Sequence, residues 1–283
     1  MIYDKIASHV GYNDKAHTYT NMNTGAKYTS VTTLIHKFVP EFKSDYWATY
    51  KALKDIMEAA GSWYSFKKAA GGWEGAVEYW HKKAIHHPAD LRQDIDVARR
   101  DYLEKWRLEK NDACEKGSAI HNELEAASYH AQEIKDEDTI YRVSQDDILN
   151  TQNFDSNGAY PELLIYSDRF MVSGQADKVF KSGKYVDIHD YKTCKKIDTE
   201  GFRGETLLAP LGHLQNANYW IYSLQLSMYG YMLAECGYKV RNLYMHWIHG
   251  KDEFDKERNA GVKTFKLPYL EEDVERILLT NTN

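Results

Sequence analysis

Val, Ile, Phe and Tyr are concentrated among charged residues in two short runs of the chain, residues 178–181 and 184–192. Runs of this composition that are bounded by turn residues are typical of β-strands. Between the runs lies Ser182-Gly183, a dipeptide typical of tight turns. The pattern therefore predicts two antiparallel strands joined as a hairpin.

The predicted hairpin has a register that brings charged residues together. If Ser182 and Gly183 form the loop, the cross-strand pairs are Lys181 with Lys184, Val179 with Val186, and Asp177 with Ile188. Side chains two residues apart share a face, so the face that begins with the valines ends in Asp177, Asp190 and Lys192. A slip of one residue would separate these three side chains, so the prediction depends on the turn.

The first forty residues show a hairpin pattern followed by a helix start. Residues 17–20 and 26–29 are rich in Thr and Tyr and flank an Asn-Thr-Gly turn. Ser30 then stands at the N-cap position of a helix over 31–38, which Pro40 ends.

The rest of the chain divides into a helical stretch and an alternating half. Residues 45–115 have a helical pattern, interrupted at Gly71-Gly72 and Pro88, and hold five of the seven tryptophans. Beyond them we expect a helix near 115–133, strands near 160–192, a helix near 213–236, strands at 240–249 and 262–267, and a final short helix.

This order, α-β-β-β-α-β, predicts an α/β fold with a mixed sheet flanked by helices. We expect three segments: an N-terminal hairpin and helix over 1–44, a helical and aromatic-rich subdomain over 45–114, and the α/β core over 115–283.

Composition and charge narrow the choice of function. The net charge of -6, from 36 Lys and Arg against 42 Asp and Glu, argues against a nucleic-acid coat protein. Residues 177–196 nevertheless hold six lysines against three aspartates, so this segment is locally positive. Three cysteines without a C-x-x-C spacing fit a reducing cytoplasm. With no signal-like start and no apolar run approaching 18 residues, we expect a cytoplasmic protein with no membrane partner.

Two predicted helices carry polar residues at helical spacing. His121 and Glu125 lie one turn apart, with Ser118 just before them. A lone helical histidine is more often structural than a ligand, but the acidic hairpin that follows favours a ligand here. Gln225 and Tyr229 are also one turn apart, and taken alone they are typical of an amphipathic core helix.

Together these residues resemble the RecB-like, Cas4-like branch of the PD-(D/E)xK nucleases, which includes the mitochondrial genome maintenance exonuclease and many phage exonucleases. Five motifs match in order: Gly117 with His121 and Glu125, Glu162, Gly174 with Asp177, Asp190 with Lys192 and Thr193, and Gln225 with Tyr229. They span residues 117–229, and each alone would be weak. The resemblance implies a restriction-endonuclease-like core and a metal-dependent DNA exonuclease that acts on single strands or strand ends. It places the protein in phage DNA replication or recombination, in the host cytoplasm, with proteins of those processes as partners.

The resemblance also implies roles for residues. The metal ligands would be His121, Glu162, Asp177, Asp190 and the Tyr191 carbonyl, and the catalytic residues Asp177, Asp190, Lys192, Glu162, Gln225 and Tyr229. Ser118, Lys195, Lys196, Gln225 and Tyr229 would contact the substrate. Oxygen ligands favour one or two Mg²⁺ or Mn²⁺ ions, and the histidine favours Mn²⁺. Some members hold an iron–sulfur cluster through four cysteines; three cannot supply it, so we expect none.

Two other functions stay open at this point. A ring-forming exonuclease that resects double strands shares the acidic and lysine positions, although the helical histidine argues against it. A catalytically silent nucleic-acid-binding module is disfavoured, because every expected catalytic position holds a competent residue. The aromatic helices before residue 115, with Lys82 and Lys83, would suit unpaired bases and phosphates, but packing explains each aromatic residue more simply.

Overall fold

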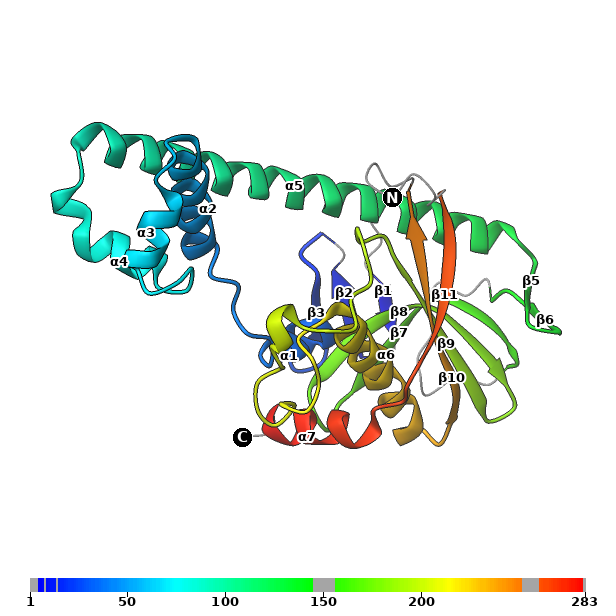
Figure 1. Ribbon diagram of the computed structural model, residues 1–283. Coiled ribbons are helices and arrows are strands. Elements are labelled where there is room, and N and C mark those ends of the chain that lie inside the picture. The colour runs from blue at the N-terminus through cyan, green and yellow to red at the C-terminus, as the bar shows by residue number, and fades with distance from the viewer. Residues whose placement is uncertain (1–4, 8, 14, 145–155, 251–259, 282–283) are drawn as a thin grey trace. The chain divides into compact units, whose positions relative to one another are not determined.

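The computed structural model describes residues 5–7, 9–13, 15–144, 156–250 and 260–281 (Figure 1). The chain forms two compact units, one from residues 1–40 and 116–283 and the other from residues 41–115. The N-terminal segment expected over 1–44 therefore belongs, up to Pro40, to the same unit as the α/β core.

A mixed sheet forms the centre of the larger unit, as the sequence predicts. Its strands run in the order β1-β2-β3-β4-β8-β9-β10-β11, with β7 paired to β8. The β4–β8 and β9–β10 pairs are parallel and the others antiparallel. The strands are β1 (Lys5–Ala7), β2 (Val10–Asn13), β3 (Thr18–Asn21), β4 (Lys27–Ser30), β7 (Gly158–Ser167), β8 (Val172–Ser182), β9 (Tyr185–Lys192), β10 (Lys239–His249) and β11 (Gly261–Leu267).

The hairpin between β8 and β9 exists, but its predicted register is wrong by two residues. The loop is Gly183-Lys184, and Ser182 pairs with Tyr185. Gly183 has a φ of 59°, which suits the first loop residue of a type II′ turn. Val179 therefore pairs with Ile188 instead of Val186. Because strand faces repeat every two residues, this shift leaves each side chain on the predicted face.

The strand pair β7–β8 bends at Glu162, which has a positive φ of 49°. Tyr160 and Leu163 lie three residues apart yet pack into the same core cluster, so the alternation of faces changes at Glu162. On β8 the same change separates Val179 from Ala176. A left-handed conformation costs a residue other than glycine roughly 1–2 kcal/mol, and such strain is concentrated at functional sites.

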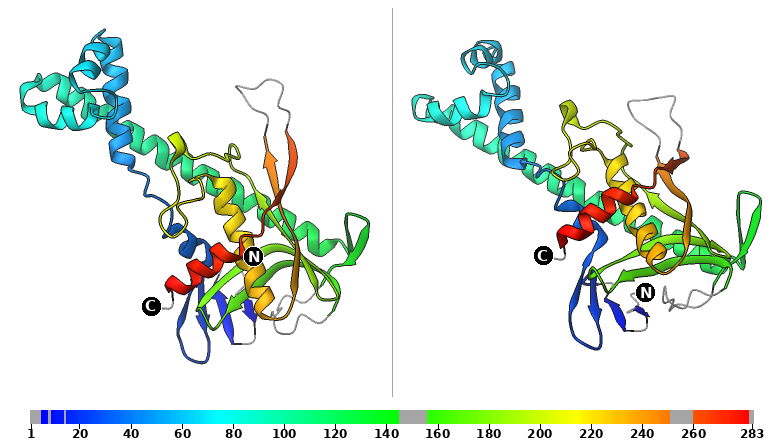
Figure 2. Two further views of the ribbon diagram at one scale, coloured as in Figure 1. Left: turned by 60° about the horizontal axis from the view of Figure 1, so that its bottom comes forward. Right: turned by 90° about the horizontal axis from the view of Figure 1, so that it is seen from below.

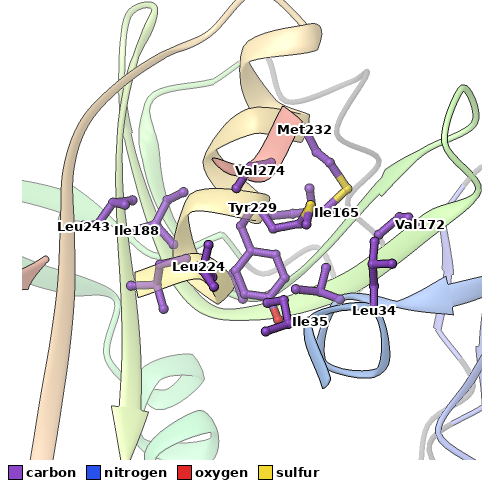
Figure 3. Close-up of a cluster of buried hydrophobic side chains, with 14 of the residues drawn as sticks. Leu34, Ile35, Ile165, Val172, Ile188, Leu224, Tyr229, Met232, Leu243 and Val274 are labelled. Atoms are coloured by element: carbon purple, nitrogen blue, oxygen red, sulfur yellow. The ribbon is translucent and has the colours of Figure 1, made fainter. Parts of the chain in front are cut away.

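Three helices cover one face of the sheet: α1 (Val31–His36), α6 (Asn218–Glu235) and α7 (Glu271–Asn281). Figure 3 shows part of the core that they share, with Tyr229 and Met232 of α6 pointing toward Ile165 and toward Leu34 and Ile35 of α1. Figure 2 shows α6 and α7 lying on the same side of the strands. The predicted N-cap is confirmed, because the Ser30 hydroxyl accepts a hydrogen bond from the Thr33 N–H.

The opposite face carries a smaller cluster formed by Tyr141, Val143, Ala159 and Phe180. Part of it comes from a separate hairpin of β5 (Glu133–Asp136) and β6 (Thr139–Arg142), which the sequence analysis did not predict. The Tyr129 hydroxyl donates a hydrogen bond to the Pro161 carbonyl at 3.2 Å, and this fixes the end of α5 (Ala89–His130) to β7.

The smaller unit is helical. It contains α2 (Ser44–Ala59), α3 (Trp63–Ala69), α4 (Ala76–Lys83), the 3₁₀ turn η1 (Ala84–His86) and the first part of α5. Trp63, Trp80 and Phe66 are buried in its core, so they pack the unit, whereas Tyr64 is 73% exposed. None of the helices in the described part of the chain is long and apolar enough to cross a membrane.

One predicted helix is shorter than expected. The helix near 213–236 begins only at Asn218, and residues before it form an irregular connection with the 3₁₀ turn η3 (Phe202–Gly204). The Asn218 side chain accepts a hydrogen bond from the Asp198 N–H and donates one to the Lys196 carbonyl, both at 2.7 Å. These bonds hold the connection against the first turn of α6.

Candidate metal centre

Three side chains from three different elements converge beside the bend in β7. His121 of α5, Glu162 of β7 and Asp177 of β8 each offer a ligand atom, and these atoms lie within 4.8 Å of one another. His121 Nδ1 lies 3.5 Å from Asp177 Oδ1. Imidazole nitrogen and carboxylate oxygen are donors that suit Mn²⁺ and related divalent cations. The arrangement is therefore a candidate metal centre.

Local structure holds two of these groups in place. Asp177 Oδ2 accepts a hydrogen bond of 2.6 Å from the Tyr191 N–H, so β9 fixes this carboxylate. The Glu162 carbonyl accepts a hydrogen bond of 3.2 Å from the Gln175 side chain, which supports the bend at Glu162. The hydrogen bond to Asp177 raises the pKa of His121, against the opposite effect of burial.

Asp190 and Lys192 lie at the end of β9, next to this group. Continuing the β8–β9 register by one residue places Asp190 opposite Asp177. The Asp190 carboxylate is almost fully buried, and the Lys192 ammonium lies 2.5 Å from its Oδ2. Burial lowers the pKa of Lys192, but the carboxylates of Asp190 and Asp177 outweigh this effect and raise it. Lys192 therefore stays charged beside the acidic residues.

The buried Asp190 carboxylate has one close cation. Its Oδ2 forms an ion pair of 2.5 Å with the Lys192 ammonium. Burial raises the pKa of Asp190 to about 6, and the neighbouring ammonium only partly opposes this. One ammonium therefore does not remove the cost of burying this carboxylate near Asp177, and a divalent cation would lower that cost. The donor set and the neighbouring carboxylates fit a divalent metal.

Gln225 and Tyr229 come together on α6, and their environment explains a predicted glycine. The Gln225 amide donates a hydrogen bond of 3.2 Å to the Tyr229 hydroxyl, and both side chains are buried. A Cβ on Gly174 would lie 2.6 Å from Cε1 of Tyr229 and 3.1 Å from Cγ2 of Val31. Gly174 is therefore needed for α6 and α1 to approach β8. The motifs at Gly174 and Tyr229 form one packing contact.

A second predicted glycine, Gly117, also lies where two elements approach each other closely. A Cβ on Gly117 would lie 3.2 Å from Oγ1 of Thr193, the residue after Lys192. The helix that carries His121 thus approaches the end of β9 at a residue without a side chain. This close approach accounts for the glycine in the helical motif.

The remaining predicted residues lie less close to the centre. Ser118 and Lys195 are exposed, and Lys196 forms an ion pair of 2.7 Å with Asp198. Tyr191 lies closer, because its N–H bonds Asp177 and its ring is edge-on to that of His121 with the centroids 6.5 Å apart, while its hydroxyl accepts a hydrogen bond of 3.1 Å from Lys178. Its main-chain carbonyl stays a predicted ligand. Lys82 and Lys83 belong to the smaller unit.

Tyr222 was missed by the sequence analysis. The Lys192 ammonium lies 4.8 Å from the centre of the Tyr222 ring. Its signal in the sequence is a position three residues before Gln225, on the same helical face. That spacing is too common to identify a site without the fold.

The chain matches no family model and no curated protein. Among solved structures it is similar to the protein described as SSO0001, with 11% identity, a coverage of 90% of this chain and 74% of that chain, and a TM-score of 0.31. A likeness at this level carries no argument about fold family or activity, so the function has to be argued from the site.

Proposed function

We propose that the protein is a metal-dependent nuclease with a restriction-endonuclease-like core, acting as a DNA exonuclease on single strands or strand ends. The observation that carries the proposal is the convergence of His121, Glu162 and Asp177 beside the buried pair of Asp190 and Lys192. These residues come from α5, β7, β8 and β9, and their order along the chain is that of the resemblance described above.

In this proposal the cation is Mg²⁺ or Mn²⁺, held by His121, Glu162, Asp177 and Asp190. When bound, it supplies an acidified water and neutralises charge on the phosphoryl oxygens. No part of the proposal uses an iron–sulfur cluster.

The chain's own residues contribute charge and orientation. Lys192 keeps its ammonium between Asp190 and the Tyr222 ring, where it offsets negative charge that develops on a phosphodiester in the transition state. Asp177 is oriented by the Tyr191 N–H, so its other oxygen faces His121. Gln225 and Tyr229 are buried, so their role in this proposal is to support the strands, with phosphate contact left to the exposed Ser118 and Lys195.

The proposal is tested with end-labelled linear and circular single-stranded DNA and linear duplex DNA, each with Mg²⁺, Mn²⁺ or EDTA. We expect loss of the linear single strand with metal and survival of the circle. Duplex preference would instead favour the ring-forming exonuclease, and binding without cleavage would favour the silent nucleic-acid-binding module.

Lys192→Ala is the variant that we expect to lose activity, and Lys184→Ala is its matched control. We expect Lys192→Ala to abolish cleavage while metal binding, followed by isothermal titration calorimetry, largely survives. Lys184→Ala is the control, because Lys184 lies in the hairpin loop at the far end of β9. Turnover by Lys192→Ala at the level of Lys184→Ala would count against the proposal.

A further inference from the structure

The end of the Lys192 side chain is held by two different groups. Its ammonium lies 2.5 Å from Asp190 Oδ2 and 4.8 Å from the centre of the Tyr222 ring. Only 16% of the side chain is exposed. A lysine has four rotatable bonds and no intrinsic geometry, so a buried ammonium needs contacts that fix its direction. Asp190 alone supplies one such contact.

The Tyr222 ring supplies the second contact, and it does so without occupying an N–H donor of the ammonium. A ring face attracts an ammonium through its quadrupole, and the attraction is strongest where water is excluded. A ring face accepts no conventional hydrogen bond. The N–H donors of Lys192 that Asp190 does not use therefore stay available to an oxygen of a bound phosphodiester.

Tyr222 is itself fixed from two sides. It is half-buried on α6, one turn after Asn218, whose hydrogen bonds hold the segment that follows β9. Burial and the neighbouring Cys194 thiol raise the pKa of its hydroxyl. The Cys194 carbonyl in turn accepts a hydrogen bond of 2.8 Å from the Trp247 indole N–H. The ring therefore has little freedom to move away from Lys192.

We propose that Tyr222 is a positioning residue that acts through Lys192: its ring face keeps the ammonium directed toward the acidic centre. This inference rests on the proposed nuclease function for its catalytic consequence, but not for the placement itself. The simpler alternative is that Tyr222 only packs the side of α6. The two are separated by substitutions that treat the ring face and the bulk of the side chain differently.

Tyr222→Phe keeps the ring face and loses only the hydroxyl, whereas Tyr222→Leu keeps most of the apolar volume and loses the ring. We expect Tyr222→Leu to lower kcat about 10-fold with little change in KM, because a desolvated cation–π contact is of that order. The kcat of Tyr222→Phe should stay within about threefold of the wild-type kcat, because the ring face is kept. Tyr219→Leu is the control, an aromatic residue on the same helix whose ring contacts Trp220 and Phe265.

A second measurement does not depend on activity. In protein with isotope-labelled lysine, the Lys192 CεH₂ signal, assigned by its loss in Lys192→Arg, should show an upfield ring-current shift. We expect that shift in the wild type, in Tyr222→Phe and in Tyr219→Leu, and its loss in Tyr222→Leu. A shift that is absent in the wild type, or that persists in Tyr222→Leu, overturns the placement.

The two measurements also distinguish the two proposals. A wild-type protein without any metal-dependent cleavage, but with the ring-current pattern expected here, would reject the nuclease and keep the Lys192–Tyr222 placement. Equal loss of kcat and of thermal stability in Tyr222→Leu and Tyr222→Phe would show a packing role, and it would reject the positioning role.

Discussion

Two aspartates on β9, three residues apart, are both almost fully buried and have opposite surroundings. Asp187 accepts hydrogen bonds from Arg241 Nε at 3.0 Å and from the Asn242 side chain at 2.8 Å, and Arg241 Nη2 also contacts it. Asp190 has an ion pair of its Oδ2 with Lys192, and burial, reinforced by the nearby Asp177 carboxylate, raises its pKa. Both are 1% exposed, so burial does not distinguish them.

The comparison separates a buried charge that belongs to the fold from one that belongs to a site. A carboxylate whose oxygens are saturated by an arginine and an amide fixes β9 to β10 and has nothing left to offer a ligand. A carboxylate paired with a single ammonium in the same sheet, beside three other potential ligands, keeps a cost of burial that a divalent cation can lower. Four measurements test this contrast.

The largest expected effect is on activity at Asp190. Asp190→Asn should lower cleavage by at least about 10³-fold, because loss of an electrostatic group at a reacting centre commonly has an effect of this size. Stability should fall as well, because the amide leaves the buried Lys192 ammonium without its nearest carboxylate, so activity is compared per folded molecule. Initial rates on a linear single strand, with thermal unfolding alongside, check both expectations. A matched Asp187→Asn variant that loses as much activity per folded molecule would remove the contrast.

The next effect is on stability at Asp187. Arg241→Ala should lower the free energy of unfolding by about 3 kcal/mol, because it leaves a buried carboxylate without its cation. This is the lower end of the usual range, since the Arg241 side chain is 42% exposed. Urea denaturation gives the value, and cleavage by the remaining folded protein should be close to that of the wild type. An unchanged midpoint would show that this pair is not structural.

A third effect comes from cation binding and depends on pH. At about 100 times its Kd, a divalent cation should stabilise the protein by about 2.7 kcal/mol. Burial raises the pKa of Asp190 to about 6. Protonation of Asp190 therefore stabilises the folded protein below the unfolded pKa, about 4, and this contribution is lost as pH rises through the folded value.

The cation competes with that proton. The rise in Tm caused by Mn²⁺ should accordingly be larger at pH 7 than at pH 5, and small in Asp190→Asn at both. The same experiment with Asp187→Asn should reproduce the wild-type difference. An equal rise in Tm with Mn²⁺ at pH 5 and at pH 7 would argue against Asp190 as a ligand.

The smallest effect is expected at Asn242. Asn242→Ala removes one hydrogen bond to Asp187 and leaves Arg241 in place, so the free energy of unfolding should fall by about 1.5 kcal/mol. A double-mutant cycle with Arg241→Ala measures how far the two donors act together. Full additivity would mean that the Asp187 cluster is less cooperative than its shared oxygens suggest.

Much of the larger unit was predictable from local patterns. The mixed sheet, the hairpin before α6 and the N-cap at Ser30 follow from runs of strand-forming residues, turn residues and capping chemistry. The register of β8 and β9 was wrong by two residues, because Ser182-Gly183 and Gly183-Lys184 are both acceptable turns. The predicted grouping of Asp177, Asp190 and Lys192 is unaffected by this error, because a register shift of two residues keeps every side chain on its predicted face.

Other features depend on contacts between distant segments. The hairpin of β5 and β6 contributes Tyr141 to a buried cluster with Phe180 that no local pattern reveals. The bend at Glu162 breaks the alternation on which strand prediction relies. No local pattern distinguishes Tyr222 from other half-buried tyrosines. Its role follows from the contact between its ring on α6 and Lys192 at the end of β9.

Local patterns in the chain establish which residue types are available for chemistry and on which faces of short elements they lie. Local backbone geometry sets those faces, and it acts over two to four residues. Three outcomes follow only from the packing of distant elements: His121, Glu162 and Asp177 meet, Asp187 is saturated by Arg241 and Asn242, and Asp190 has Lys192 as its close cation. These outcomes depend on how helices and strands far apart in the chain pack together, and packing at that range leaves no periodic trace in the sequence.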